Sequence, residues 1–281
     1  MSDIYYVNGE FVEAENALLP VTDLAVLRGY GVFDFMRTYN GQPFHLEAHI
    51  DRLFTSADIV KLAMPWSREE VAEIITQTLA RNTDHDDYSV RVVVTGGASP
   101  DNITPGGQPR LIVMVSGVTP PPAEHYINGV KIITLRESRY LAQAKTTNYV
   151  SGVLALQEAH AREAVEAIYV NNASHILEGT TTNIFLFHGD TLITPADNIL
   201  PGITRSVVME LAREVFTVEE RRVHINDLYD ADEVFITASN KQVMPVIQVD
   251  DKVISSGTPG RRTRKIMALF SEATGTPLPT E

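Results

Sequence analysis

The chain contains 281 residues, of which 44% are hydrophobic and 21% are charged, as in a globular protein long enough for two domains. A formal net charge of −13 at pH 7 argues against a general nucleic-acid or anionic-membrane binder, because both functions need a basic surface. The absence of cysteine excludes disulfides and thiolate metal sites, and no apolar run predicts a signal peptide or a membrane span. We therefore expect a cytoplasmic protein without nucleic-acid or membrane partners.

Hairpins and amphipathic helices fill the first 115 residues. Asn-Gly pairs at 8–9 and 40–41 each separate two apolar runs, which predicts β-hairpins because both residue types tolerate positive φ. Apolar spacing predicts a helix over residues 46–62, and Ser67 followed by Glu70 predicts a capping box for a helix over 67–80. Runs of β-branched residues predict strands over 88–95 and 111–115.

A proline-rich stretch over residues 117–124 is expected to be stiff and extended. We predict a small N-terminal α/β domain over residues 1–118, an interdomain linker over 119–126 and a large C-terminal domain over 127–281. In the second domain we expect strands over 130–135, 167–170, 233–237 and 246–249, a further hairpin over 184–193, and helices over 150–164, 203–215 and 262–273. The fold class is therefore mixed α/β.

Lys145 lies in a short polar turn between an expected strand and an expected helix. Most lysines in turns are solvated surface charges. Lys145 could instead be a nucleophile, because an amine in its free-base form attacks an aldehyde to form a Schiff base. Burial or a neighbouring cation would lower its pKa far enough for that chemistry.

Glu178 lies just before the turn Gly-Thr-Thr-Thr-Asn at residues 179–183. A carboxylate here could accept a hydrogen bond from a protonated pyridine nitrogen, which would make the ring an electron sink for carbanion chemistry. The alternative is a glutamate that only caps the turn.

Several residues could hold an anion through helix-start amides, polar groups after a strand, or a guanidinium. They are Ile203, Thr204, Ser239, Asn240 and Arg52. Combined with Lys145 and Glu178, such a site suggests a phosphorylated aldehyde cofactor bound as a Schiff base. The eight histidines are scattered without the spacing of a metal site, so no metal is expected.

With these residues in place, the chain resembles the fold-type IV pyridoxal 5'-phosphate (PLP) enzymes almost end to end. That group holds branched-chain aminotransferases, D-amino acid transaminases, (R)-amine transaminases and aminodeoxychorismate lyase. Residues 28–35 look like its Gly-x-x-Phe-Glu segment, and residues 49–53 look like its phosphate-arginine helix. Further motifs follow in the family's order at 145–149, 178–183, 200–205, 231–235 and 243–245.

The resemblance implies a two-domain fold of the D-amino acid aminotransferase-like type with PLP as cofactor. Lys145 would form the Schiff base and carry the reacting proton, and Glu178 would pair with the pyridine nitrogen. The phosphate would be held by Arg52, Ile203, Thr204, Ser239 and Asn240. Tyr149 would lie near the phenolate oxygen, although its spacing fits packing against the following helix equally well. Family members are homodimers, which implies a homodimer whose active site is completed by the partner subunit.

Substrate-binding residues implied by the resemblance are Arg28, Phe33 and Arg91. In a subgroup of D-amino acid transaminases, arginines at the positions of Arg28 and Arg91 receive substrate carboxylates, and two guanidiniums suit a dicarboxylate such as 2-oxoglutarate. Arg91 could alternatively be a strand-end charge paired with an acidic residue. The chain departs from bacillary D-transaminases, which have an arginine where the loop at 95–101 has glycines, and it has Asn240 where many relatives have threonine.

We therefore expect a transaminase that moves an amino group between a D-amino acid, of the D-alanine or D-glutamate type, and a 2-oxo acid such as 2-oxoglutarate. The first alternative is a branched-chain L-amino acid aminotransferase with (R)-amine side activity. A lyase and a catalytically silent PLP-binding protein on the same fold are the others.

Overall fold

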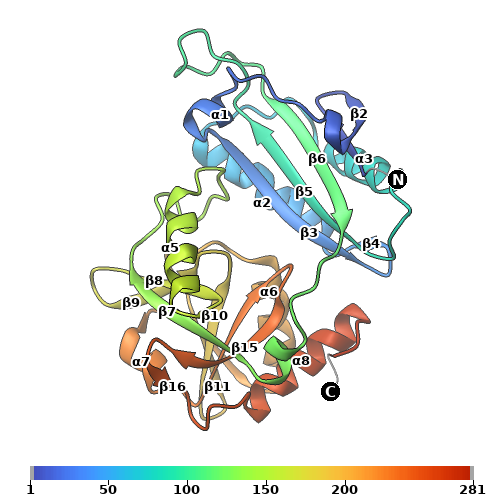
Figure 1. Cartoon of the computed structure of the whole chain (residues 1–281). Coiled ribbons are helices and arrows are strands. Elements are labelled where there is room, and N and C mark those ends of the chain that lie inside the picture. Colours follow the sequence, from blue (N-terminus) through green and yellow to red (C-terminus); the bar gives the residue numbers. More distant parts are fainter. Residues whose placement is uncertain (1–2, 279–281) are drawn as a thin grey trace. The chain divides into compact units, whose positions relative to one another are not determined.

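A computed structural model describes residues 3–278, and the chain divides into two compact units (Figure 1). The first unit is Met1–Thr119 with Ala144–Tyr149, and the second is Pro120–Gln143 with Val150–Glu281. In contrast to the consecutive domains that the sequence predicts, Ala144–Tyr149 belongs to the first unit. The reason is backbone pairing, because the Phe33 amide donates to the Lys145 carbonyl at 2.9 Å and the Thr147 amide donates to the Gly31 carbonyl at 2.9 Å.

The first unit is built on an antiparallel sheet in the order β2-β1-β6-β5-β3-β4. Helices α2 and α3 cover one face of this sheet (Figure 1). The strands are β1 (Ile4–Val7), β2 (Glu10–Glu13), β3 (Gly31–Tyr39), β4 (Gln42–Pro43), β5 (Tyr88–Thr95) and β6 (Arg110–Gly117). The helices are η1 (Ala14–Asn16), α1 (Leu24–Arg28), α2 (Leu46–Val60) and α3 (Arg68–Leu79).

Local sequence accounts for these elements. Both Asn-Gly pairs lie in the left-handed region, with φ of 47° and 110° at residues 8 and 9 and of 52° and 73° at residues 40 and 41, so both predicted hairpins are confirmed. The predicted capping box is also confirmed. The Glu70 amide donates to Ser67 Oγ at 3.1 Å, and the Ser67 amide donates to Glu70 Oε2 at 2.7 Å.

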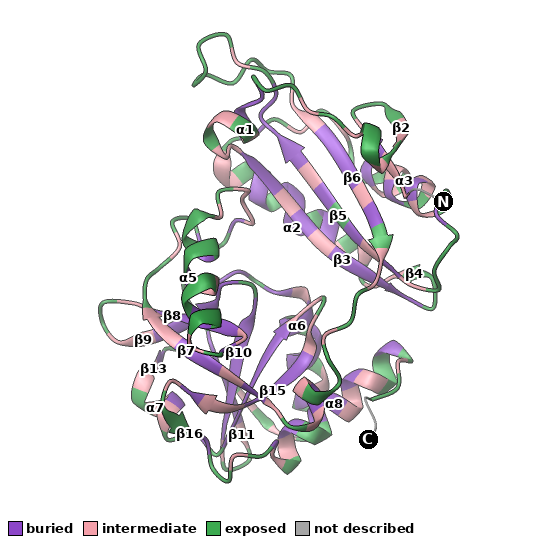
Figure 2. Cartoon of the chain, in the orientation of Figure 1, coloured by how far each residue is buried: buried purple, intermediate pink, exposed green. Residues whose placement is uncertain are grey.

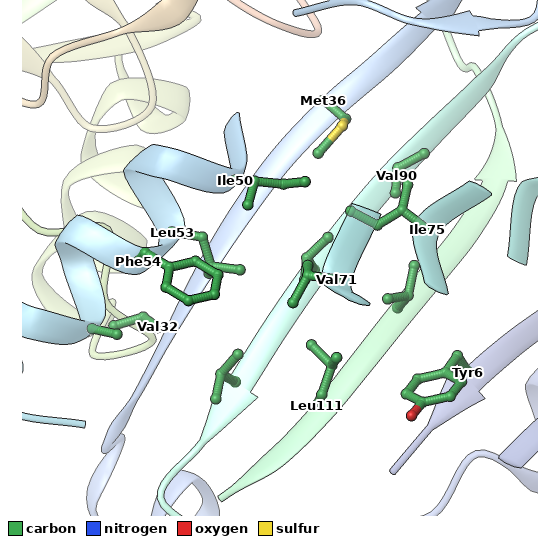
Figure 3. Close-up of a cluster of buried hydrophobic side chains, with 14 of the residues drawn as sticks. Tyr6, Val32, Met36, Ile50, Leu53, Phe54, Val71, Ile75, Val90 and Leu111 are labelled. Atoms are coloured by element: carbon green, nitrogen blue, oxygen red, sulfur yellow. The ribbon is translucent and has the colours of Figure 1, made fainter. Parts of the chain in front are cut away.

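The core of the first unit lies between the sheet and the two helices. Figure 3 shows Leu53 of α2 with Val71 and Ile75 of α3 directed at the sheet strands. Alternation along β5 buries Val90, Val92 and Val94 against these helices, because successive side chains of a strand point to opposite faces. Arg91 consequently lies on the other face of the sheet.

The second unit is built on a ten-stranded mixed sheet in the order β12-β11-β10-β14-β15-β7-β8-β9-β13, with β16 beside β15. Three neighbouring pairs, β11–β12, β15–β7 and β7–β8, are parallel. The strands are β7 (Val130–Arg136), β8 (Glu166–Val170), β9 (His175–Gly179), β10 (Asn183–His188), β11 (Thr191–Pro195), β12 (Thr217–Arg221), β13 (Val223–His224), β14 (Glu233–Ala238), β15 (Gln242–Val249) and β16 (Lys252–Val253).

Helices surround this second sheet. They are α4 (Glu124–Ile127), α5 (Val150–Ala161), α6 (Ile203–Arg213), α7 (Ile225–Tyr229) and α8 (Arg261–Thr274). Helix α5 packs on β7 and β8, while α6 and α8 contact each other and β14. Strand β8 is buried along its whole length, and β10 and β14 are buried except at their last residue (Figure 2), which explains their continuous apolar runs.

The mixed α/β fold predicted from the sequence is confirmed. Two edge strands were not predicted, because β12 has the polar sequence Thr-Val-Glu-Glu-Arg and β13 has two residues. Among residues 3–278, no helix has both the length and the apolar character needed to cross a membrane.

Candidate active site

Lys145 lies in a short extended segment that pairs with β3. Its amide donates to Ser56 Oγ at 3.0 Å, and Ser56 Oγ in turn donates to the Arg52 carbonyl within α2 at 2.8 Å. Thr146 forms an antiparallel bridge with Val32. Both a strand and a helix therefore fix the backbone of the lysine.

The Lys145 side chain lies over an aromatic ring. Its Nζ is 4.5 Å from the centroid of the Phe33 ring, and the Tyr149 ring meets the same ring edge-on at a centroid distance of 6.1 Å. The first unit thus brings together three of the predicted site residues. Tyr149 packs against Phe33, and its predicted contact with a cofactor stays a prediction.

Arg52 on α2 forms a two-pronged ion pair with Asp34 on β3. Its Nε and Nη2 atoms each lie 2.8 Å from a carboxylate oxygen of Asp34, and His49 Nδ1 lies 2.6 Å from Asp34 Oδ1. All three side chains are buried. Burial opposes ionisation of Asp34, but Arg52 and His49 outweigh it and hold the pKa of that carboxyl well below its usual range. Asp34 thereby fixes the guanidinium, whose predicted contact with a phosphate stays a prediction.

Burial lowers the pKa of His49 more than the neighbouring Asp34 raises it. The imidazole is therefore neutral at pH 7 and donates its Nδ1 hydrogen to Asp34, an assignment that follows from the hydrogen-bond partner. Neither Asp34 nor His49 had a predicted role, although both lie within the segments that resemble the family.

The two predicted substrate arginines have different environments. Arg91 lies opposite Phe35 in the β3–β5 pairing, and its guanidinium carbon is 5.2 Å and 5.3 Å from the ring centroids of Phe33 and Phe35. None of the ion pairs described within residues 3–278 involves Arg91. Arg28 is exposed at the end of α1, and its Nη1 donates to the Leu27 carbonyl at 2.7 Å.

Glu178 lies in β9 of the second unit with its carboxylate buried. The Leu200 amide donates to Oε2 at 2.8 Å, and Arg139 Nη1 lies 3.1 Å from Oε1. Two donors therefore orient the carboxylate from different segments. Arg139 had no signal in the sequence, and Leu200 entered only as the first residue of the motif at 200–205, because their contacts with Glu178 arise only when distant segments pack together.

Helix α6 begins just after Leu200, the residue whose amide contacts Glu178. Asn183 Nδ2 donates to the Leu200 carbonyl at 3.0 Å, and a Cβ atom on Gly202 would lie only 2.0 Å from Asn183 Oδ1. A side chain at Gly202 would therefore displace the Asn183 amide, and no side chain caps the helix. Its first turn contains no acidic residue and includes Ile203 and Thr204. Such a helix start favours an anion.

Ser239 and Asn240 lie in the turn between β14 and β15, which the Lys241 amide closes by donating to the Ala238 carbonyl at 3.1 Å. The second unit thus contains Glu178, the α6 start and this turn. Of the predicted site residues, Lys145, Tyr149, Arg52, Phe33, Arg91 and Arg28 belong to the first unit.

A lysine held against a sheet, a buried oriented carboxylate and an uncapped helix start able to hold an anion are the groups expected of a PLP enzyme. Residues 31–249 match the model of the amino-transferase class IV family, and the chain belongs to this family, whose members depend on PLP. The predicted fold-type IV relationship and the predicted cofactor are confirmed.

Relatives of the chain carry two different names. It is 35% identical over 277 residues to a putative branched-chain-amino-acid aminotransferase of Methanocaldococcus jannaschii, with 95% of each chain covered. It is 32% identical over 273 residues to a D-alanine aminotransferase of Listeria monocytogenes, with 95% of this chain and 94% of that one covered. Among solved structures, it is similar to the branched-chain aminotransferase of the archaeon Thermoproteus uzoniensis with norvaline, with a TM-score of 0.90, 27% identity, and coverage of 98% of this chain and 95% of that one.

The residues of this chain fit PLP by their chemistry. The amine of Lys145 can form a Schiff base with an aldehyde. The Glu178 carboxylate, which two donors already orient, can accept a hydrogen bond from a protonated pyridine nitrogen. The α6 start, without a side-chain cap or an acidic residue, suits a phosphate.

Proposed function

We propose that this class IV aminotransferase transfers an amino group between a D-amino acid, of the D-alanine or D-glutamate type, and a 2-oxo acid such as 2-oxoglutarate. The chemistry that PLP supplies when bound is capture of the amino group by its aldehyde and withdrawal of electrons by its ring. The two substrates would react in turn by a ping-pong mechanism.

Lys145 is the proposed catalytic residue. Its Nζ would hold the cofactor aldehyde and, as a free amine, take the proton from the substrate Cα. The position of Nζ above the Phe33 ring supports this role, because the ring excludes water from one side of the amine. The hydrogen bonds of the Lys145 backbone to Ser56 and Phe33 would keep the amine in place between the two half-reactions.

Five groups would hold the cofactor and set its electronics. Glu178 would keep the pyridine nitrogen protonated, and its hydrogen bond from Leu200 would orient the carboxylate for that contact. The amides of Ile203 and Thr204, the Ser239–Asn240 turn and Arg52 would receive the phosphate. Tyr149 would lie beside the phenolate oxygen.

The observation that carries the substrate proposal is the environment of Arg91. Its guanidinium lies over two phenyl rings and has no acidic partner among residues 3–278. A carboxylate of the substrate would supply the missing counter-charge, and a planar guanidinium suits it in a two-pronged geometry. With Arg28 as a second cation, this arrangement favours a dicarboxylate such as 2-oxoglutarate.

A branched-chain L-amino acid aminotransferase is the second candidate. The name of the Methanocaldococcus jannaschii relative favours it, and so do the Phe33 and Phe35 rings near Arg91, which would pack against an apolar side chain. An (R)-amine side activity belongs to this alternative.

We further propose a cytoplasmic homodimer in which Arg28 of one subunit serves the active site of the other. The resemblance to fold-type IV enzymes supports this arrangement, and the exposure of Arg28 at the end of α1 is compatible with it.

The proposed function is tested by half-reactions of the PLP-loaded protein with D-alanine, D-glutamate and L-leucine. Conversion of the bound cofactor to its pyridoxamine form by the D-amino acids is the expected result. Conversion by L-leucine alone would favour the second candidate.

A further inference from the structure

Glu166 is a buried carboxylate that the proposed function does not use. It begins β8 and has no exposed surface. Its oxygens accept hydrogen bonds from the amides of Ala167 at 3.0 Å, Thr180 at 3.1 Å and Thr181 at 3.3 Å, and from the Thr181 hydroxyl at 2.6 Å. The Thr180 hydroxyl also donates to it. Glu166 therefore fixes the turn that follows directly after Glu178.

Glu166 and this turn are in close contact, and Gly179 leaves space for the Glu166 side chain. A Cβ atom on Gly179 would lie 3.0 Å from Glu166 Cγ and 2.2 Å from Thr182 Oγ1. The Glu166 side chain thus packs directly against the backbone at the end of β9. A shift of Glu166 would displace the residue next to Glu178.

Lys241 brings a counter-charge to Glu166 from a distant part of the chain. Its Nζ lies 3.5 Å from Glu166 Oε2 and 2.6 Å from Thr181 Oγ1, and its side chain is 16% exposed. Lys241 also closes the turn that contains Ser239 and Asn240. A buried carboxylate is costly without a nearby cation, so Lys241 stabilises Glu166 in this position. The contacts of Lys241 also join two turns that are 60 residues apart at Thr181 and Lys241.

We propose that Glu166 and Lys241 are positioning residues for PLP. Their ion pair holds the turn after Glu178 and the Ser239–Asn240 turn in one fixed arrangement, so that the groups for the pyridine nitrogen and for the phosphate are in place before the cofactor arrives. This inference rests on the proposed function of Glu178, Ser239 and Asn240. Its physical basis is preorganisation, since a site that is already ordered spends less binding free energy on ordering.

The test compares Lys241→Met with Lys241→Arg in the full-length protein stripped of cofactor and titrated with PLP. Lys241→Met removes the cation but keeps an unbranched chain, and we expect the PLP Kd to rise about tenfold. Lys241→Arg keeps the charge and should bind PLP within about threefold of wild type. The thermal midpoint of the cofactor-free protein is measured alongside.

A second pair of variants tests the contact between Glu166 and Lys241 at Thr181, which is exposed. Thr181→Val deletes the hydroxyl that joins Glu166 to Lys241, whereas Thr181→Ser retains it. We expect only Thr181→Val to weaken PLP binding. The double variant of Lys241→Met and Thr181→Val should bind PLP no more than about threefold more weakly than either single variant. The reason is that both substitutions interrupt the same contact between Glu166 and Lys241.

The outcomes separate this inference from the proposed function. Wild-type protein that fails to bind PLP would overturn the proposed function. Wild-type binding of PLP together with unchanged Kd values in Lys241→Met and Thr181→Val would overturn only the positioning role, even if the thermal midpoint falls. If Lys241→Met does not fold, the Thr181 pair decides, because Thr181 is exposed and its substitution leaves Glu166 with its counter-charge.

Discussion

Under the proposed function, Arg91 would make an apolar surface selective for substrates with a second carboxylate. Its neighbours on the exposed face of the first sheet are Phe33 and Phe35, so the guanidinium is the polar group among aromatic rings. An apolar substrate side chain could pack on the rings, while a second carboxylate could pair with the cation. The charge on Arg91 should therefore matter for dicarboxylates and little for small monocarboxylates.

We predict that Arg91→Ala raises the KM for 2-oxoglutarate about ten- to hundredfold, as expected for loss of a charge-assisted hydrogen bond worth about 1.5–3 kcal/mol. The KM for pyruvate should change less than about threefold. Steady-state kinetics with both acceptors measure the difference. Arg81→Ala is the matched control, because Arg81 also lies over a phenyl ring, that of Phe11, but has no proposed substrate role. Equal effects of Arg91→Ala on both acceptors would count against its role.

Single residues were predictable where a local motif reports their chemistry. In the sequence, Lys145, Glu178 and the α6 start each lie in or beside a short polar turn. The structure places Glu178 near the end of β9, and it gives Lys145 and Glu178 ordered hydrogen-bond partners. Glu166 had no such signal. It precedes an apolar strand, and a carboxylate at such a position is usually exposed, so only the folded chain shows that Thr180 and Thr181 bury it.

A buried polar cluster attaches α2 to β3 in the first unit. Asp34 accepts hydrogen bonds from both His49 and Arg52, which are three residues apart and therefore lie on the same face of the helix. The same face packs Leu53 into the core (Figure 3). The helix carrying the predicted phosphate arginine is thus fixed by both apolar and ionic contacts.

This link makes stability depend on pH through His49. Its pKa in the folded protein is lowered by burial, whereas in the unfolded chain it is about 6.5. Below about pH 6.5, His49 binds a proton in the unfolded chain but stays neutral in the folded chain. The free energy of unfolding therefore falls as the pH drops towards the pKa of His49 in the folded protein. Asp34 acts at lower pH, because its depressed pKa contributes stability that is lost only below about pH 4.

We predict that His49→Asn makes the free energy of unfolding less dependent on pH between about 5 and 6.5. The Asn amide can still donate to Asp34, but it does not titrate. Urea midpoints at pH 5.5 and 7.5 provide the measurement. His160→Asn, at an exposed position of α5, is the control and should behave as wild type. The same pH dependence in His49→Asn and wild type would contradict this explanation.

Regular elements with strong local signals were predictable, and those defined by pairing were not. The helix expected over 46–62 is α2, and the one expected over 67–80 is α3, which begins at its capping box. Strand β12 exists because it pairs in parallel with β11, and its polar sequence carries no strand signal. The segment Ala144–Tyr149 was expected in the second domain, and its pairing with β3 could not be read from spacing.

At the scale of the whole molecule, the predicted cofactor residues are divided between the two units. Arg52, Lys145 and Tyr149 belong to the first unit, whereas Glu178 and the later positions proposed to bind the phosphate belong to the second. Under the proposed function, one chain therefore supplies both sets, and Arg28 alone would come from a partner subunit.

That division predicts complementation between two impaired variants. Lys145→Ala should fold but lack turnover, and Arg28→Ala should be nearly inactive at low 2-oxoglutarate. Refolding the two together should restore about a quarter of wild-type activity, because half of the dimers are then mixed and each contains one intact site. Lys145→Ala mixed with Glu178→Ala is the control and should restore nothing, since both residues would serve the same site. Absence of recovery in the first mixture would place Arg28 outside the partner's site.

The central claim concerns the enantiomer that donates the amino group, and one measurement addresses it most directly. PLP-loaded protein is mixed with D-alanine, L-alanine, D-glutamate, L-glutamate or L-leucine without an acceptor, and the absorption of the bound cofactor is followed. We predict conversion to the pyridoxamine form with both D-amino acids and no conversion with the three L-amino acids. Conversion by L-leucine and L-glutamate, with the D-amino acids inert, would contradict the proposal and identify a branched-chain L-aminotransferase.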